Sequence, residues 1–171
     1  LKFNKPLLID HPFEDWVWND VPKFRKEQVR KWIFEKEKLN WNQMFNLPKS
    51  MKEKLEEKFD LMPMEKVQVQ GSRDSTQKFL WILRDNQLIE SVLIPATIGT
   101  KGIRASRLTL CVSTQVGCAL QCKFCASGLD GLKRNLTTGE IVGQILLARK
   151  EAGKRIDTVS YTHLTLPTRS Y

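Results

Sequence analysis

Three of the four cysteines in this 171-residue chain lie in one short run, GCALQCKFCASG, at residues 117–128. They are Cys118, Cys122 and Cys125, and their spacing is C-x3-C-x2-C. Three neighbouring cysteines cannot all pair as disulfides, and a closed zinc site normally takes four ligands. Because soft thiolates select zinc, copper or iron–sulfur centres, the run predicts a metal centre on this segment.

Two kinds of centre fit the cysteines, and inert thiols are the third reading. A zinc site needs a fourth ligand, for which Cys111 is available, whereas the two histidines, His11 and His163, are remote in sequence. A [4Fe–4S] cluster held by three cysteines would instead leave its fourth iron free for an exogenous ligand. The spacing favours the cluster, because structural zinc sites usually have a second, distant cysteine pair.

The elements on either side of the run must position it. The segment RLTLCVS predicts a strand with one apolar face (Leu108, Leu110 and Val112) and one small polar face (Thr109, Cys111 and Ser113). RIDTV predicts another strand further on. With a helix between them, the two strands would form a βα unit of a parallel sheet or barrel. Active sites of such folds lie in loops that follow the strands, which is where the cysteines fall.

The helix of this unit is predicted over LTTGEIVGQILLARKEAG. Thr137 and Glu140 have the spacing of a capping box, and Gly153 is a plausible C-terminal cap. We expect the buried stripe of this helix to consist of Ile141, Ile145 and Ala148, widened by Val142 and Leu146.

Residues 1–63 are expected to form a helical accessory module. The segment VPKFRKEQVRKWIFEK predicts a helix whose stripe contains Phe24, Val29, Trp32, Ile33 and Lys36. A second helix is predicted after Pro48, with Met51, Leu55 and Phe59 on one side. LNWNQMFNL, between them, predicts a short helix or turn. The five tryptophans are expected to belong mainly to the core, although stacking on bases is an alternative.

Residues 64–100 are expected to form a β-hairpin bridge, with two strands joined at Asp85-Asn86. Glu90 shares a strand face with apolar neighbours, where an unpaired carboxylate is costly. The alternative is an edge position with the carboxylate in water. A glycine-containing loop, ATIGTKGIRAS, should follow, with three cations in or beside it: Lys101, Arg104 and Arg107.

The net charge of +9 lies mostly in residues 61–171. It fits an anionic partner, with nucleic acid first, or a basic protein that has no such partner. A cluster on the first helix could contact RNA phosphates or be a solvated face: Lys23, Arg25, Lys26, Arg30 and Lys31. We expect no membrane span and, because the first residues do not resemble a secretory signal, a reducing, cytoplasmic location.

RLTLCVSTQVGCALQCKFCASG and GLKRNLTTGEIVGQI resemble the RlmN-type RNA adenine-C2 methyltransferases, a family of radical S-adenosylmethionine (SAM) enzymes. KFRKEQVRKWIF resembles the N-terminal helical module of that family, and IESVLIP its pre-barrel strand. The resemblance implies an α/β fold with a helical N-terminal module, a short β bridge and the first βα unit of a partial (β/α) barrel. It also implies a [4Fe–4S] cluster on Cys118, Cys122 and Cys125, SAM on the open iron, and Phe124 as the aromatic residue of the motif.

The resemblance further implies radical methylation of adenine C2 in 23S rRNA, and in some tRNAs, with two SAM molecules and an external one-electron donor. It gives Glu90 the role of proton acceptor, and Cys111 that of resolving a covalent protein–RNA adduct by forming a disulfide. The rival reading is a non-catalytic RNA-binding module with zinc on Cys111 and the three loop cysteines. In either case we expect a monomer.

The resemblance stops near Val159. We expect residues 101–159 to be the start of the barrel with the cluster loop, and residues 160–171 to be a foreign tail. A family member would continue into a Gly-rich turn, further barrel strands and a late cysteine. We therefore expect a truncated chain that has an open sheet edge and is inactive alone.

Overall fold

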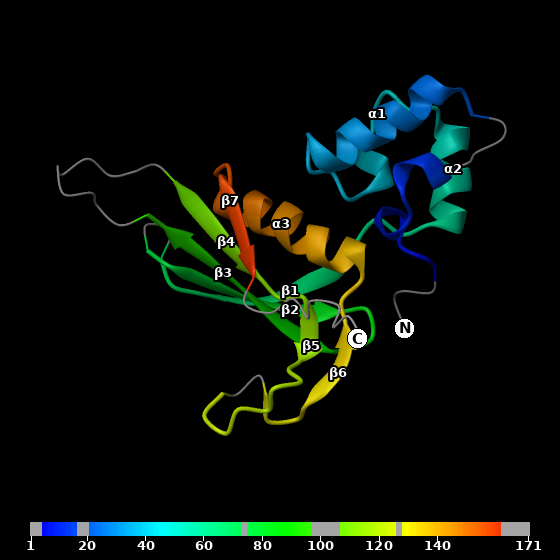
Figure 1. Ribbon diagram of the computed structural model, residues 1–171. Helices are drawn as coiled ribbons and strands as arrows, with labels where there is room; N and C mark the ends of the chain where they lie inside the picture. Colours follow the sequence, from blue (N-terminus) through cyan, green and yellow to red (C-terminus); the bar gives the residue numbers. More distant parts are fainter. Residues whose placement is uncertain (1–4, 17–20, 73–74, 97–106, 126–127, 162–171) are drawn as a thin grey trace, which may run out of the picture.

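The computed structural model describes residues 5–16, 21–72, 75–96, 107–125 and 128–161 (Figure 1). Short 3-10 helices span Leu8–Asp10, Phe13–Asp15 and Trp41–Gln43, and the α-helices are α1 (Lys23–Phe34), α2 (Lys49–Lys58) and α3 (Thr138–Ala152). The strands are β1 (Met64–Gln70), β2 (Gln77–Leu83), β3 (Leu88–Pro95), β4 (Leu108–Val112), β5 (Gln115–Gly117), β6 (Leu132–Asn135) and β7 (Thr158–Tyr161). The predicted α/β class is confirmed.

The helical part contains α1 and α2, with the short Trp41–Gln43 helix between them. Val29, Trp32 and Ile33 are buried along α1, as predicted. The placement of Phe24 in the stripe is wrong, since 56% of this residue is exposed. Phe24 lies in the first helical turn, where the Arg25 guanidinium sits 4.9 Å from the centre of its ring.

The main sheet has the strand order β1-β2-β3-β4-β7 (Figure 1). Strands β1 to β4 pair antiparallel, and β7 pairs parallel with β4. The predicted turn between β2 and β3 is confirmed, with Asn86 at a positive φ of 65°. The predicted bridge is larger than a hairpin, because β1 adds a third strand. The βα unit is confirmed, since α3 connects the parallel strands β4 and β7.

Helix α3 has both predicted caps, but its buried stripe differs from the predicted one. Thr137 and Glu140 form the capping box, and Gly153 ends the helix with φ 61°. Ile141, Val142 and Ile145 are only half-buried, while the buried residues are Gly139, Glu140, Gly143, Gln144, Leu146, Leu147 and Ala148. Glycine explains the shift: a Cβ on Gly143 would lie 2.3 Å from Cγ of Pro63. The helix backbone therefore packs against Pro63 at a position where a larger side chain would not fit.

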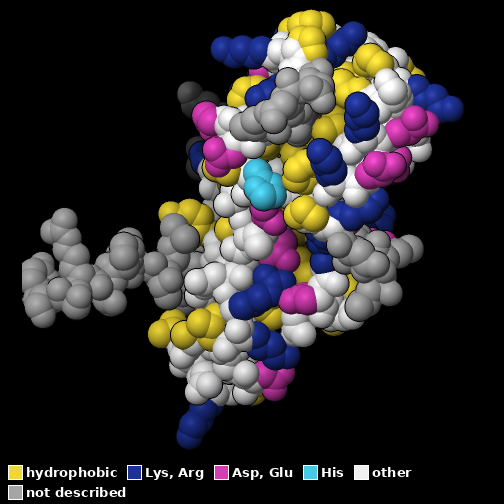
Figure 2. Space-filling model, turned by 90° about the vertical axis from the view of Figure 1, so that its right-hand side faces the viewer, with side chains coloured by type: hydrophobic (Ala, Val, Ile, Leu, Met, Phe, Trp, Pro, Cys, Tyr) yellow, Lys and Arg dark blue, Asp and Glu magenta, His cyan; other side chains and the backbone are white. Residues whose placement is uncertain are grey.

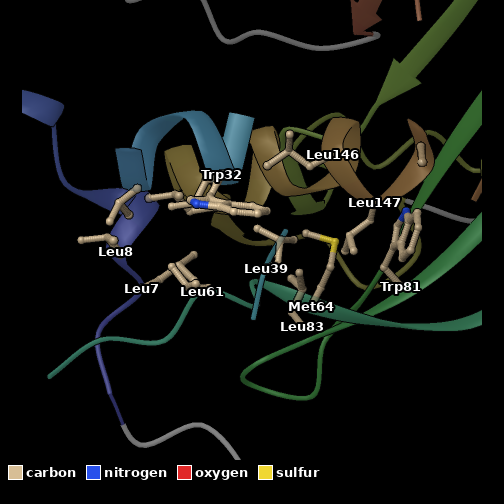
Figure 3. Packing of buried hydrophobic residues seen from close by; sticks show 14 of the residues in the cluster. Leu7, Leu8, Trp32, Leu39, Leu61, Met64, Trp81, Leu83, Leu146 and Leu147 are labelled. Carbon is tan, nitrogen blue, oxygen red and sulfur yellow. The ribbon is translucent and has the colours of Figure 1, made fainter. Parts of the chain in front are cut away.

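One buried cluster joins the helical part to the sheet. In Figure 3 its side chains run from Leu8 and Trp32, through Met64, to Trp81. Polar contacts cross the same boundary: Arg84 pairs with Asp60 at 2.7 Å. The helical part and the sheet therefore share one core.

The tryptophans of the described segments belong to that core, as predicted. Each of the following is at most 8% exposed: Trp16, Trp32, Trp41 and Trp81. Trp18 lies outside the described residues. In the described part of the chain, none of the helices combines the length and the apolar character that crossing a membrane requires.

Candidate metal centre

The cysteine loop begins and ends on a two-stranded stem that we did not predict. Strands β5 and β6 pair antiparallel, with Val116 opposite Arg134. At the end of the stem where the cysteine loop starts, the Cys118 N–H donates to the Gly131 carbonyl at 3.1 Å. Gly117 has φ 77°, and a Cβ there would lie only 1.9 Å from the Gly131 oxygen. Glycine at position 117 is thus required for the strands to close on each other beside the first cysteine.

The three loop cysteines differ in exposure. Cys118 is buried, while Cys122 and Cys125 are half-buried, and all four cysteines of the chain are free thiols. A turn joins the last two, since the Cys125 N–H donates to the Cys122 carbonyl at 3.0 Å. Phe124, between them, is 93% exposed. The loop therefore has a fixed base and an exposed outer end.

The donor chemistry of this loop fits an iron–sulfur centre, although its ligands are not gathered. Within the described segments, no group of three or more His, Cys, Asp or Glu side chains lies close enough together to hold a metal ion. The same finding applies to the four-cysteine zinc set that includes Cys111. Three unpaired thiols on one loop are nevertheless the soft donors that such centres use, and metal binding is commonly coupled to ordering of the site.

Cys111 and Glu90 lie on one face of the main sheet. The β3–β4 register places Cys111 opposite Val92, which is two residues from Glu90 on the same side of β3. Diagonal neighbours on adjacent strands lie about 7–8 Å apart, so the two side chains are neighbours. The Ser113 hydroxyl donates to the Glu90 carbonyl at 2.7 Å, which fixes the end of this pairing.

The apolar neighbours of Glu90 on its strand face do not bury its carboxylate. Leu88 is 54% exposed and Ile94 is 42% exposed on the same strand face. The Glu90 carboxylate is half exposed and pairs with Lys78 Nζ at 3.0 Å. The alternative, a carboxylate in water, is the observed one, but β3 is an inner strand rather than an edge.

A polar node beside the stem was missed at the level of sequence. Arg134 Nε donates to Asp85 Oδ2 at 2.8 Å, and its two terminal nitrogens donate to the Glu140 carboxylate at 2.7 and 2.8 Å. Hydrogen bonds to Glu140 and then to Asp85 raise the pKa of Arg134. Partial burial opposes ionisation of Asp85, but hydrogen bonds from Arg134 and the Gln87 N–H outweigh it and lower the Asp85 pKa. The predicted capping box located Glu140; nothing local in the sequence linked Asp85 to it.

The basic residues do not form one continuous patch on the face in Figure 2, where Lys and Arg lie among Asp and Glu. On α1, Arg30 pairs with Glu27 at 2.5 Å, and this hydrogen bond lowers the Glu27 pKa. Of the cations beside the glycine-containing loop, Arg107 donates to the Thr158 hydroxyl at 3.1 Å. Lys101 and Arg104 lie outside the described residues.

The βα unit with a cysteine loop after its first strand has a counterpart among solved structures. The structure matches that of a radical SAM methyltransferase from Sphaerobacter thermophilus with a TM-score of 0.76 and 34% sequence identity. The match covers 90% of this chain and 45% of that chain.

In sequence, the chain is similar to RlmN-type RNA methyltransferases. Residues 15–61 match the ribosomal RNA large subunit methyltransferase N-terminal domain. The chain is 48% identical over 149 residues to a probable dual-specificity RNA methyltransferase RlmN of Akkermansia muciniphila, covering 87% of this chain and 42% of the relative. A protein of the same name from Thermotoga neapolitana is 42% identical over 152 residues, covering 88% and 42%. The family resemblance is confirmed, and the chain spans less than half the length of these relatives.

Proposed function

We propose that this chain is part of an RNA methyltransferase that modifies C2 of adenine in 23S rRNA, and in tRNA, by a radical mechanism. The observation that carries the proposal is the shared sheet face of Glu90 and Cys111. Cys111 lies on strand β4, and β4 leads into the stem of the cysteine loop. Glu90, Cys111 and the three loop cysteines therefore lie on two neighbouring strands and on the loop that follows them.

In this proposal Cys118, Cys122 and Cys125 hold a [4Fe–4S] cluster through three of its irons. The cluster, with SAM on its open iron, would supply one-electron chemistry that the protein side chains cannot provide. An external donor supplies the electron. Phe124, exposed between the last two cysteines, is available to contact SAM.

Glu90 and Cys111 act on the RNA rather than on the cluster. Glu90 accepts a proton from the adenine, and its carboxylate is held by Lys78 at 3.0 Å. Cys111 would resolve the covalent adduct by attacking the sulfur of the late, methyl-carrying cysteine that the family resemblance implies, so that an S–S bond forms as the bond from that sulfur to the RNA-bound carbon breaks. Both roles need substrate access, and the exposed neighbours Leu88 and Ile94 show that the described residues leave this face open.

We also propose a cytoplasmic, monomeric protein. Four free thiols fit a reducing compartment, since cysteines of oxidising compartments are usually paired. The net charge of +9 supports an RNA partner, because phosphate contacts by Lys and Arg provide much of the affinity for nucleic acids.

Anaerobic reconstitution of the chain with iron and sulfide tests this function. We expect a brown protein with about four irons and four sulfides per chain, as a [4Fe–4S] cluster contains. Cys122→Ser should abolish cluster uptake. Cys111→Ser is the matched control and should retain it. One zinc per chain without labile sulfide, lost equally in Cys111→Ser, would instead establish the zinc-binding module.

A further inference from the structure

The stem of the cysteine loop needs an anchor outside its own strands. Strands β5 and β6 form a separate two-stranded sheet and share no ladder with the main sheet. In Figure 1 this stem extends away from the main sheet. Backbone pairing with the main sheet therefore does not fix its direction, so side-chain contacts must contribute.

Arg134 makes the strongest of these contacts. It lies on β6 and donates to Asp85, in the turn between β2 and β3, and to Glu140, in the first turn of α3. A further hydrogen bond reaches the Asn135 carbonyl at 3.1 Å. One guanidinium thus ties the stem both to the helix that follows it and to a turn that is distant in sequence. Charge-assisted, bidentate contacts of this kind are among the strongest hydrogen bonds in proteins.

Glu140 offers Arg134 a carboxylate that is already fixed. Its side chain is only 6% exposed. One of its oxygens also accepts the Thr137 N–H at 2.9 Å within the capping box. By contrast, Lys133 reaches the same turn only through an exposed hydrogen bond to Gln87. Arg134 is therefore the principal polar anchor of the stem, beside the apolar contact that buried Val116 makes with the core.

We propose that Arg134 is a positioning residue, which holds the stem so that the cysteine loop keeps a defined place relative to the main sheet. This inference rests on the proposed function, because it takes the cysteine loop to hold a [4Fe–4S] cluster. Arg134 lies opposite Val116, two residues before Cys118, so a shift of the arginine passes through one strand pair to the first cysteine. Lysine cannot replace it fully, because an ammonium group lacks the planar fork that binds two carboxylates at once.

The test compares wild-type chain with Arg134→Gln and Arg134→Lys after anaerobic reconstitution. Residues that orient metal ligands without binding the metal typically change metal affinity by about 10-fold to 100-fold. We expect a chelator to extract iron from Arg134→Gln about tenfold faster, at the lower end of that range, and from Arg134→Lys at an intermediate rate. The electron paramagnetic resonance spectrum of the reduced cluster should also shift in Arg134→Gln.

Hydrogen exchange of the chain without iron gives a second readout. The Cys118 amide, bonded to Gly131 across the stem, should exchange faster in Arg134→Gln than in wild type. This readout remains decisive if wild-type chain takes up no cluster, a result that would overturn the proposed function alone.

Arg84→Gln is the matched control. Arg84 is also a half-buried arginine that joins distant elements, through Asp60 and the Lys5 carbonyl. It should lower overall stability without changing iron extraction, the spectrum or Cys118 exchange. If Arg134→Gln matches wild type in all three readouts, or Arg84→Gln changes them equally, Arg134 has no positioning role.

Discussion

The two faces of the main sheet are made by alternate residues of the same strands, and they differ sharply. On the face beneath α3, Trp81 and Leu110 are fully buried and Ser91 is 1% exposed. On the opposite face, Leu88 and Ile94 are exposed beside Glu90. Because alternate residues point to opposite faces, the residues that stabilise the fold lie on one face, while the face that carries the proposed catalytic groups stays exposed.

The covered face also sets the geometry of the open one. Gln144 of α3 accepts from the Ser91 hydroxyl at 2.7 Å and from the Ser113 N–H at 2.9 Å, and donates to the Ser113 carbonyl at 2.9 Å. The Trp81 indole N–H donates to the same Ser91 hydroxyl at 3.0 Å. Ser113 in turn bonds the Glu90 backbone. A buried polar network thus fixes the strand ends that carry the proposed catalytic groups.

The largest effect should come from Trp81→Ala on the covered face. Trp81 is fully buried and stacks on Phe79, so its removal should lower the free energy of unfolding by about 3–5 kcal/mol. Urea denaturation followed by circular dichroism measures the change. Leu88→Ala, on the open face, is the control and should cost much less. Equal losses for the two variants would contradict the distinction between the faces.

A smaller loss is expected for Gln144→Leu. The substitution introduces an apolar side chain and leaves the Ser113 N–H and carbonyl without their partner, at a cost of about 1–3 kcal/mol. The same denaturation experiment applies, with exposed Gln68→Leu on β1 as the control. Unchanged stability in Gln144→Leu would mean that water replaces the network.

Acid should weaken the contact between the stem and the main sheet. Because folding lowers the Asp85 pKa from 3.8, its ionised form stabilises the fold above that value, and the contribution is lost as pH falls through the lower, folded pKa. Asp85 is 43% exposed, so the contribution should stay below about 1 kcal/mol. Wild type should therefore exceed Asp85→Asn in stability near neutral pH and converge with it in acid. A difference independent of pH would exclude this origin.

The smallest effect should follow Glu90→Gln. Both partners of the Glu90–Lys78 pair are more than 40% exposed, and such surface changes usually alter stability by less than about 0.5 kcal/mol. Urea midpoints of the variant and wild type should therefore agree. A large loss of stability would instead show that Glu90 supports the fold, as residues on the covered face do.

Features that depend on neighbouring residues could be predicted from the sequence. The turn at Asp85-Asn86 and the capping box of Thr137 and Glu140 each need only a few consecutive residues. The cysteine spacing belongs to the same category. Features set by distant contacts could not be predicted: the stem of β5 and β6 consists of short strands that pair across the loop.

The α3 stripe shows why periodicity alone misled. Large apolar residues such as Ile141 and Ile145 suggested the buried side, but contact is closest at Gly139 and Gly143. The shared face of Glu90 and Cys111 likewise depends on the register of β3 against β4. The segment that connects these two strands includes residues outside the described ones.

The packing of Gly143 on Pro63 has a consequence for how the molecule comes apart. Because this contact lies where the helical part meets the sheet, the helical part cannot detach without exposing the core of α3. The two parts should melt in a single cooperative transition rather than in sequence. Brief proteolysis of the native chain should accordingly fail to release an intact helical piece. We therefore expect the close packing at Gly143 to make the helical part and the sheet unfold as one cooperative unit.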